Sequence, residues 1–368
     1  MEIVGCPRQT PMQKQRFVTA FHRNALHNTT IVFLISLLQT GPVRAAEAKI
    51  WEDFSGDKAF AHVQRLVDFG PRPAGSDALE KSRTYIEEQL RRYGWNTRRQ
   101  AYTEDTPRGK THFVNLIAQF GTQKKAASPV FLLCTHYDTK AFDTIRFVGA
   151  NDGGSSTGLV LELARVIGQH PTLAGKIELV FFDGEEAFEQ FSDTDGLYGS
   201  RYFARQLQGS GTKQFRGGLL FDMVGDRSLG ITLPNDSPAD MARDIFAAAE
   251  ALKLRSYFTY LGRDLIDDHV PLNGIGIPTL DVIDFDYPWW HTADDTTDKI
   301  SGSSLQIVGS IALYYLSEII SRSAHMRGRR FFNFRIALTP FSRQSARESS
   351  PEWSVSHQCP IRPVKALV

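Results

Sequence analysis

The chain has 368 residues, of which 42% are hydrophobic and 23% are charged. That length and composition are typical of a globular protein with the core of one large α/β domain. Lysine and arginine total 42 against 41 acidic residues, a formal net charge of +1, so charge gives no argument for nucleic acid or a membrane surface as a partner. The three cysteines, Cys6, Cys134 and Cys359, are too scattered for a disulfide framework or a cysteine-rich zinc site.

The first 48 residues have the order of a secretory signal. Basic residues precede an apolar run at 31–38 (IVFLISLL), which is too short to span a bilayer, and a small-residue cleavage site follows at 46–48. We therefore expect residues 1–48 to be a signal peptide with an N-terminal extension. This predicts a secreted or periplasmic protein that keeps no membrane span after cleavage. A membrane anchor or a disordered arm is the alternative.

Apolar runs alternate with helical patterns over the next part of the chain, residues 49–321. The hydrophobic spacing predicts helices over 76–93, 155–167, 200–208, 238–252 and 303–320. Short apolar runs predict strands over 130–134, 177–182, 218–224 and 279–283. Strands that alternate with helices indicate an α/β fold in a single domain, with a mostly parallel central sheet flanked by helices on both faces.

The last segment, residues 322–368, differs in composition from the predicted domain. It contains eight arginines and one lysine against two glutamates, and no helical or alternating pattern persists in it. We expect a basic, disordered tail. A basic contact arm is the alternative.

Polar residues follow the predicted strands directly. His136 comes after the run VFLLC, Glu185 and Glu186 come after IELVFF, and Asp222 comes after GLLF. Because the carboxyl ends of strands in an open α/β sheet form the ligand-binding edge, we expect these side chains to lie close together.

Further acids and a histidine complete a candidate metal site at this edge: Asp152, Asp268 and His291. Imidazole and carboxylate ligands suit zinc, and the absence of suitable cysteines favours a catalytic over a closed structural site. Each residue alone also fits a structural role, such as a strand-end histidine, a solvated acidic pair, a helix cap or a core tryptophan. Their joint placement after successive strands favours function.

Six segments resemble animal-type glutaminyl-peptide cyclotransferases (glutaminyl cyclases), which share the fold of the zinc metallo-aminopeptidases of peptidase family M28. They are GANDGGSSTG (149–158), FFDGEEAF (181–188), DGLYGSRYFA (195–204), LLFDMVG (219–225), DDHVPL (267–272) and WWHTADDT (289–296). The similarity runs in order from about 69 to 321. The tryptophan directly before His291 is closer to the cyclases than to the aminopeptidases.

The resemblance implies a metal site and a catalytic group. Asp152, Glu186 and His291 match the zinc ligands of the cyclases. In the aminopeptidases, His136 and Asp222 would bind a second zinc, and this chain has both residues. The resemblance therefore implies one zinc ion and leaves a second one open.

The remaining matches concern catalysis and the substrate pocket. Glu185 matches the general acid/base, and Asp222 with Asp268 match carboxylates that form a hydrogen-bond network beside it. Trp290 matches a pocket tryptophan, while Phe191 stands where many cyclases have another tryptophan. A phenyl ring keeps an apolar wall and loses the indole N–H.

The resemblance implies a zinc-dependent transferase that converts the N-terminal glutamine of peptides or proteins to pyroglutamate and releases ammonia. The alternative is a metallo-aminopeptidase that hydrolyses N-terminal residues from peptides. The same acidic residue would take a proton from the substrate amine in the first reaction and from a water molecule in the second. Metal count and pocket shape therefore separate the two reactions better than residue types do.

Overall fold

The computed structural model describes residues 49–121 and 129–320. Its helices are α1 (Gly56–Asp68), α2 (Asp77–Arg92), α3 (Gly154–Gly168), α4 (Pro171–Ala174), α5 (Tyr198–Leu207), α6 (Ala239–Ala251), α7 (His269–Gly274) and α8 (Gly302–Tyr314), which continues into a π-helical turn (Tyr315–Ile320). Its strands are β1 (Trp95–Thr106), β2 (Gly109–Phe120), β3 (Val130–His136), β4 (Ile177–Phe182), β5 (Phe215–Asp222), β6 (Ile231–Leu233), β7 (Phe258–Tyr260) and β8 (Thr279–Ile283). Short 3₁₀ turns lie at Ile50–Glu52, Gly209–Gln214 and Arg255–Tyr257.

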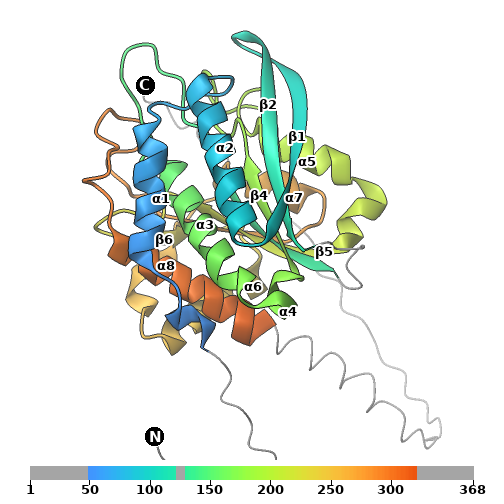
Figure 1. Ribbon diagram of the computed structural model, residues 1–368, viewed down its shortest axis with the longest axis vertical. Coiled ribbons are helices and arrows are strands. Elements are labelled where there is room, and N and C mark those ends of the chain that lie inside the picture. The colour runs from blue at the N-terminus through green and yellow to red at the C-terminus, as the bar shows by residue number, and fades with distance from the viewer. Residues whose placement is uncertain (1–48, 122–128, 321–368) are drawn as a thin grey trace, which may run out of the picture. The chain divides into compact units, whose positions relative to one another are not determined.

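The central sheet has the strand order β1-β2-β4-β3-β5-β8 (Figure 1). Strands β4, β3, β5 and β8 pair in parallel, whereas β1 and β2 form an antiparallel hairpin that joins the edge of β4. The expected α/β fold with a sheet flanked by helices is confirmed. The sheet is mixed, because the long hairpin, which the sequence patterns did not predict, extends it on one side. The small β6–β7 pair is separate.

Alternate residues of each inner strand enter two different cores. In β4, Leu179 and Phe181 join the larger core, which is closed by α1, α2, α3 and α8. Val180 and Phe182 join the smaller core on the opposite face, where α5 and α7 contribute Phe203 and other apolar side chains. Because both faces are covered, every residue of β4 is buried and all but Glu178 are apolar, which produces the nearly continuous apolar run seen in the sequence.

The predicted elements agree closely with the structure where the sequence is strongly patterned. Strands β4 and β8 have the predicted bounds, and α2 lies within the predicted range. Helix α2 begins after Ser76, whose hydroxyl accepts a hydrogen bond from the Leu79 N–H. The helix predicted over 303–320 ends as an α-helix at Tyr314 and continues as the π-helical turn.

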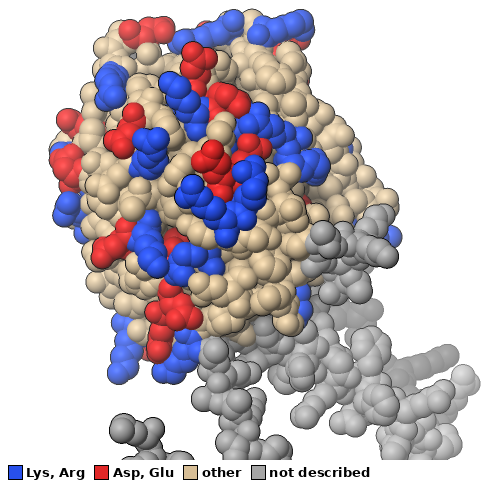
Figure 2. All heavy atoms as spheres, in the orientation of Figure 1, with Lys and Arg blue, Asp and Glu red and all other residues tan. Residues whose placement is uncertain are grey.

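Charges of both signs are interspersed on the face shown in Figure 2, as the near-zero net charge suggests. Among residues 49–121 and 129–320, no helix is long and apolar enough to cross a bilayer. The predicted signal segment (1–48) and the predicted basic tail (322–368) lie outside the described residues.

Candidate active site

The predicted site residues meet at the carboxyl ends of the parallel strands. His136 and Asp222 are the last residues of β3 and β5. Glu185 and Glu186 lie in the turn after β4, and Asp152 lies in the loop before α3. This edge is where an open α/β sheet places its ligands.

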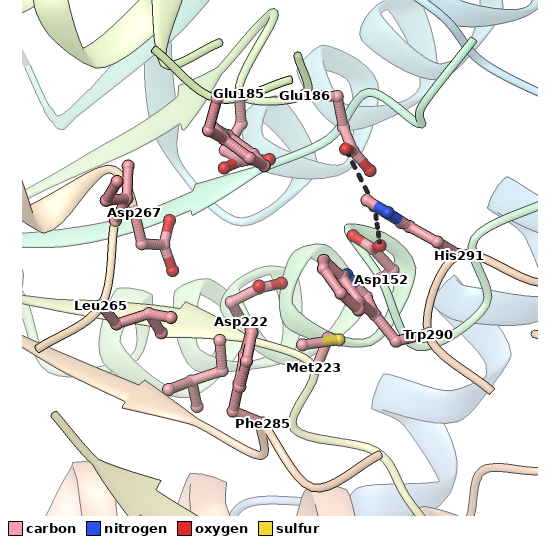
Figure 3. Close-up of a pocket in the computed structure, with 13 residues that line it drawn as sticks. Asp152, Glu185, Glu186, Asp222, Met223, Leu265, Asp267, Phe285, Trp290 and His291 are labelled. Atoms are coloured by element: carbon pink, nitrogen blue, oxygen red, sulfur yellow. Dashed lines mark hydrogen bonds and ion pairs between the residues drawn. The ribbon is translucent and has the colours of Figure 1, made fainter. Parts of the chain in front are cut away.

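One acid–histidine group joins the turn after β4, the loop before α3 and the loop between β8 and α8, which carries His291. The Nε2 atom of His291 lies 3.1 Å from Oε2 of Glu186 and 3.5 Å from Oδ2 of Asp152 (Figure 3). Both carboxylates are buried, and Oδ2 of Asp152 has no hydrogen-bond partner. Three ligand atoms therefore converge on one point.

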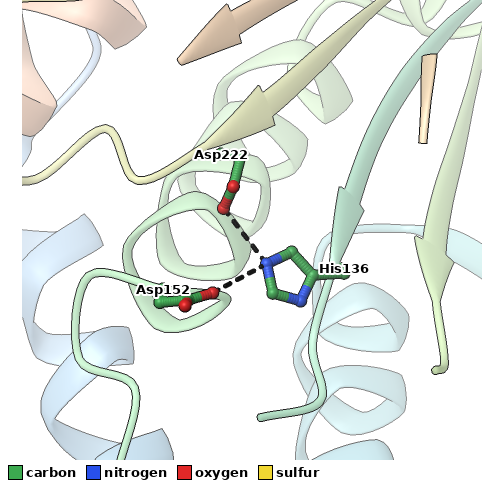
Figure 4. Close-up of side chains that lie close together, drawn as sticks. All are labelled: His136, Asp152 and Asp222. Atoms are coloured by element: carbon green, nitrogen blue, oxygen red, sulfur yellow. Dashed lines mark hydrogen bonds and ion pairs between the residues drawn. The ribbon is translucent and has the colours of Figure 1, made fainter. Parts of the chain in front are cut away.

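A second group shares Asp152 with the first. The Nε2 atom of His136 lies 3.3 Å from the other oxygen of Asp152, Oδ1, and 3.1 Å from Oδ1 of Asp222 (Figure 4). In each group the ligand atoms all lie within 4.8 Å of one another. The Asp152 carboxylate thus lies between the two histidines, with one oxygen toward each.

Two further aspartates hold the ligand-bearing loops in place. Asp295 accepts hydrogen bonds from the N–H groups of Asn151 (2.8 Å) and Asp152 (3.1 Å). Asp138 accepts from the N–H groups of Glu185 (3.2 Å) and Glu186 (3.4 Å). The sequence interpretation assigned neither aspartate a role, although Asp138 lies two residues after His136 and Asp295 lies within the segment WWHTADDT.

The third member of the first group, His291, is held by its backbone and by aromatic rings. His291 has a φ of 56°, a left-handed conformation that is costly for a residue with a side chain and that concentrates at functional sites. Its ring stacks on Trp290 with centroids 4.1 Å apart, and the edges of Phe142 and Phe147 contact it at 5.7 and 5.8 Å. Packing therefore fixes the direction of Nε2.

A pocket opens beside this histidine and combines acidic groups with an apolar wall (Figure 3). Phe191 and Trp290 line it, as predicted. Asp268 does not: it is completely buried, and the preceding residue, Asp267, lines the pocket. The complete lining is Asp152, Glu185, Glu186, Phe191, Asp222, Met223, Leu265, Ile266, Asp267, Ile283, Phe285, Trp290 and His291.

Burial dominates the electrostatics of the site. It raises the pKa of Asp222 to about 7 and raises the pKa of Glu185 well above its usual value, to which the charges of Glu186 and Asp267 add. Burial alone would lower the pKa of His136, but Asp222 and the neighbouring carboxylates raise it well above its usual value. So many carboxylates in one buried place need protons or a cation to balance them.

The residues fit a bound zinc ion. Asp152, Glu186 and His291 supply two oxygens and one nitrogen, a donor set typical of catalytic zinc. The unpartnered Oδ2 of Asp152 and the converging Nε2 of His291 have the arrangement that a shared cation satisfies. The pocket adjoins this group and leaves room for a substrate atom.

Residues 115–316 match the model of peptidase family M28. The chain belongs to peptidase family M28. The bovine glutaminyl-peptide cyclotransferase is 30% identical to it over 298 residues, which cover 69% of this chain and 79% of the bovine protein.

Solved structures give the same relationship. The glutaminyl cyclase of an Acidobacteriales bacterium is 34% identical to this M28 protein, covers 77% of it and 99% of its own chain, and has a TM-score of 0.67. A Zn-dependent exopeptidase from Parabacteroides distasonis is 27% identical, covers 72% of this chain and 98% of its own, and has a TM-score of 0.66. Cyclases and exopeptidases thus share this fold.

Proposed function

We propose that this M28 protein is a glutaminyl-peptide cyclotransferase that converts the N-terminal glutamine of peptides or proteins to pyroglutamate. The observation that carries the proposal is the 34% identity that extends over 99% of a bacterial glutaminyl cyclase. The pocket supports it: a buried carboxyl group, Glu185, stands beside the candidate metal ligands and faces an apolar wall that includes Trp290.

In this reaction the α-amine of the substrate attacks the side-chain amide carbon of the same glutamine. The new C–N bond closes the five-membered ring, and the amide nitrogen leaves as ammonia. Glu185 would accept the proton that the amine loses and return it to the departing nitrogen. Asp267 and Asp222 face the same pocket and would orient the amine.

Asp152, Glu186 and His291 would hold one zinc ion. Bound there, zinc supplies Lewis-acid polarisation of the substrate's amide carbonyl. The stacked rings of Trp290 and His291 keep that imidazole aimed at the two carboxylates, and the apolar side chains around the pocket restrict water.

The decisive experiment uses the zinc-loaded protein and a glutamine-initiated dipeptide, with products identified by mass. Release of ammonia with the peptide bond intact is the expected result. Release of free glutamine would overturn the proposal. A dipeptide with N-terminal asparagine is the matched control, since its shorter side chain places the amide carbon out of reach for a five-membered ring.

Aminopeptidase activity is the second candidate, and one observation favours it. The group of His136, Asp152 and Asp222 could hold a second metal ion next to the first. Two ions suit activation of a water molecule, which hydrolysis needs and cyclisation does not. Metal analysis of the active protein distinguishes the two: one zinc per chain favours the cyclase, and two with amino-acid release favour the aminopeptidase.

We also propose that the chain is exported to the periplasm or secreted, on the strength of the signal-like order of residues 1–48. N-terminal sequencing of the protein recovered from cells tests this. A mature protein that begins near Ala48 is expected, and an intact N-terminus on a cytoplasmic protein would contradict export.

A further inference from the structure

A charged side chain, that of Arg72, is completely buried in the segment between α1 and α2. It is one of the largest completely buried side chains in residues 49–121 and 129–320. Within those residues its guanidinium group donates hydrogen bonds to five main-chain carbonyl oxygens and to no carboxylate. A buried charge is costly unless its surroundings compensate it, so this placement needs an explanation. Neither the proposed metal ligands nor the proposed acid/base group supplies one.

The two shortest of these hydrogen bonds fasten the loop that carries Asp152. Nη1 of Arg72 donates to the carbonyl oxygen of Val148 at 2.7 Å, and Nη2 donates to that of Gly149 at 3.0 Å. The bonds to the other three carbonyl groups are longer, at 3.4 Å each. The guanidinium group therefore holds most firmly the chain just ahead of Asp152.

The N–H groups of the same loop bind an acid. The N–H of Ala150 donates to the main-chain carbonyl oxygen of Asp295 at 3.3 Å, and the next two N–H groups, of Asn151 and Asp152, donate to its carboxylate. A buried cation thus takes the acceptors at the start of the loop, and a buried aspartate takes the donors that follow. Residues 148–152 are fixed by both kinds of main-chain group.

Arg72 also binds the segment that follows β3. Its backbone N–H donates to Oγ1 of Thr139 at 2.9 Å, and its carbonyl oxygen accepts the N–H of Thr139 at 3.1 Å. Its Nε atom donates to the carbonyl oxygen of Tyr137 at 3.4 Å. These two residues follow His136 and flank Asp138, which accepts the N–H groups of the turn after β4. One residue therefore connects two of the segments that carry candidate ligands.

The two segments pack against each other without a side chain between them at Gly149. This glycine has a φ of 51°, and a Cβ there would lie 2.5 Å from the carbonyl oxygen of Asp152 and 2.7 Å from Cγ2 of Thr139. Packing this tight transmits a displacement at residues 148–149 to Asp152.

Arg72 stays charged at neutral pH. Burial lowers its pKa to about 10, and the charges of Asp295, Asp138 and Asp152 oppose that change. The arginine therefore provides a permanent positive charge in a part of the protein that is rich in buried carboxylates.

We propose that Arg72 is a positioning residue for the proposed zinc site: its guanidinium group fixes the loop of residues 148–152 so that the two oxygens of Asp152 stay directed toward His136 and His291. Without this support, zinc binding would have to order the loop, and the protein would bind zinc more weakly while it remains folded. The inference rests on the proposed zinc ligands and not on the reaction, so it applies to a cyclase and to an aminopeptidase alike.

Substitution of Arg72 by lysine tests the proposal. Arg72→Lys keeps the charge but replaces a planar fork of five N–H donors by an ammonium group with three, which cannot span the same carbonyl groups. We expect its Kd for zinc, measured by competition with a chromophoric chelator, to rise about tenfold. Arg72→Met, which also removes the charge, should bind zinc more weakly still. An Arg72→Lys variant with a Kd within about threefold of the wild type would overturn the proposal, whether or not Arg72→Met folds.

Gly309→Ala is the matched control for a general loss of stability. Gly309 lies on α8 against Phe54, so this variant should melt at a lower temperature and keep the wild-type Kd for zinc. If Gly309→Ala weakens zinc binding as much as Arg72→Lys does, the positioning role is wrong.

Amide hydrogen exchange of the zinc-free protein provides a readout that needs neither metal nor substrate. The N–H groups of residues 150–152 should exchange faster in Arg72→Lys than in the wild type and at an unchanged rate in Gly309→Ala. Unchanged exchange in Arg72→Lys would overturn the inference. If the wild type binds no zinc, the ligand assignment and the proposed function are wrong, and this measurement still decides whether Arg72 fixes the loop.

Discussion

A buried histidine far from the pocket should make the stability of the protein depend on mildly acidic pH. His62 of α1 is 7% exposed, and its Nδ1 atom lies 2.6 Å from the hydroxyl of Tyr85 on α2. Burial, helped by the charge of Arg165, lowers the pKa of His62 from 6.5 to about 4. The folded protein therefore keeps this ring neutral at pH values where an unfolded chain would protonate it.

The magnitude follows from the two pKa values. A depressed pKa contributes stability that is present above 6.5 and is lost as the pH falls toward 4, because protons bind preferentially to the unfolded chain. At about 1.36 kcal/mol per pKa unit, the full loss is about 3 kcal/mol, of which about 2 kcal/mol is already lost at pH 5. For a domain of this size, that loss lowers the melting temperature by several degrees.

Urea unfolding of the wild type and of His62→Asn at pH 7.5 and pH 5 measures the effect. Asparagine can keep a hydrogen bond to Tyr85 but does not titrate, so its free energy of unfolding should fall by about 2 kcal/mol less over this interval. Tyr85→Phe is the matched control: it removes the hydroxyl, keeps the histidine and should retain the pH dependence. Equal pH dependence in the wild type and His62→Asn would refute the reasoning.

Three further predictions concern the site and the core. Glu185→Gln should lower kcat at least about 100-fold and leave bound zinc unchanged, as measured by elemental analysis; full activity would remove Glu185 from the proton transfer. His291→Ala should lose both zinc and activity, and so should the wild type after dialysis against a chelator, with recovery on adding zinc. A zinc-replete His291→Ala variant would contradict the ligand assignment. Gly309→Ala should destabilise the fold by about 1–3 kcal/mol, because its Cβ would overlap the buried ring of Phe54. Adding Phe54→Leu to this variant should recover part of the lost melting temperature. An unchanged melting temperature for Gly309→Ala alone would show that the ring moves aside.

The sequence predicted best the elements that both cores cover. Strands β4 and β8 have their predicted bounds because nearly every residue in them is apolar or buried. The β1–β2 hairpin was not predicted, since β1 (WNTRRQAYTEDT) is mostly exposed and rich in charged and polar residues. Its place in the sheet depends on the pairing of β2 with β4, a long-range contact that local periodicity does not encode.

The residues of the candidate site were easier to predict than their environment. Because ligand-binding residues gather at the carboxyl ends of parallel strands, the sequence predicted that His136, Glu186 and Asp222 lie close together, and in the structure they do. It could not decide which of the adjacent Asp267 and Asp268 faces the pocket, because that depends on the turn in front of α7.

The contact between Asp295 and the Asp152 loop links two proposed ligands to one piece of chain. His291 and Asp295 occupy the same loop, so this segment supplies one ligand and also clamps the backbone of another. Exchanging that loop between M28 proteins would transfer ligand and clamp together. If the Asp152 loop alone is exchanged, its backbone N–H groups lose the aspartate that accepts their hydrogen bonds, because that aspartate stays in the other protein. In chimaeras of M28 proteins, the two loops should therefore come from the same parent protein.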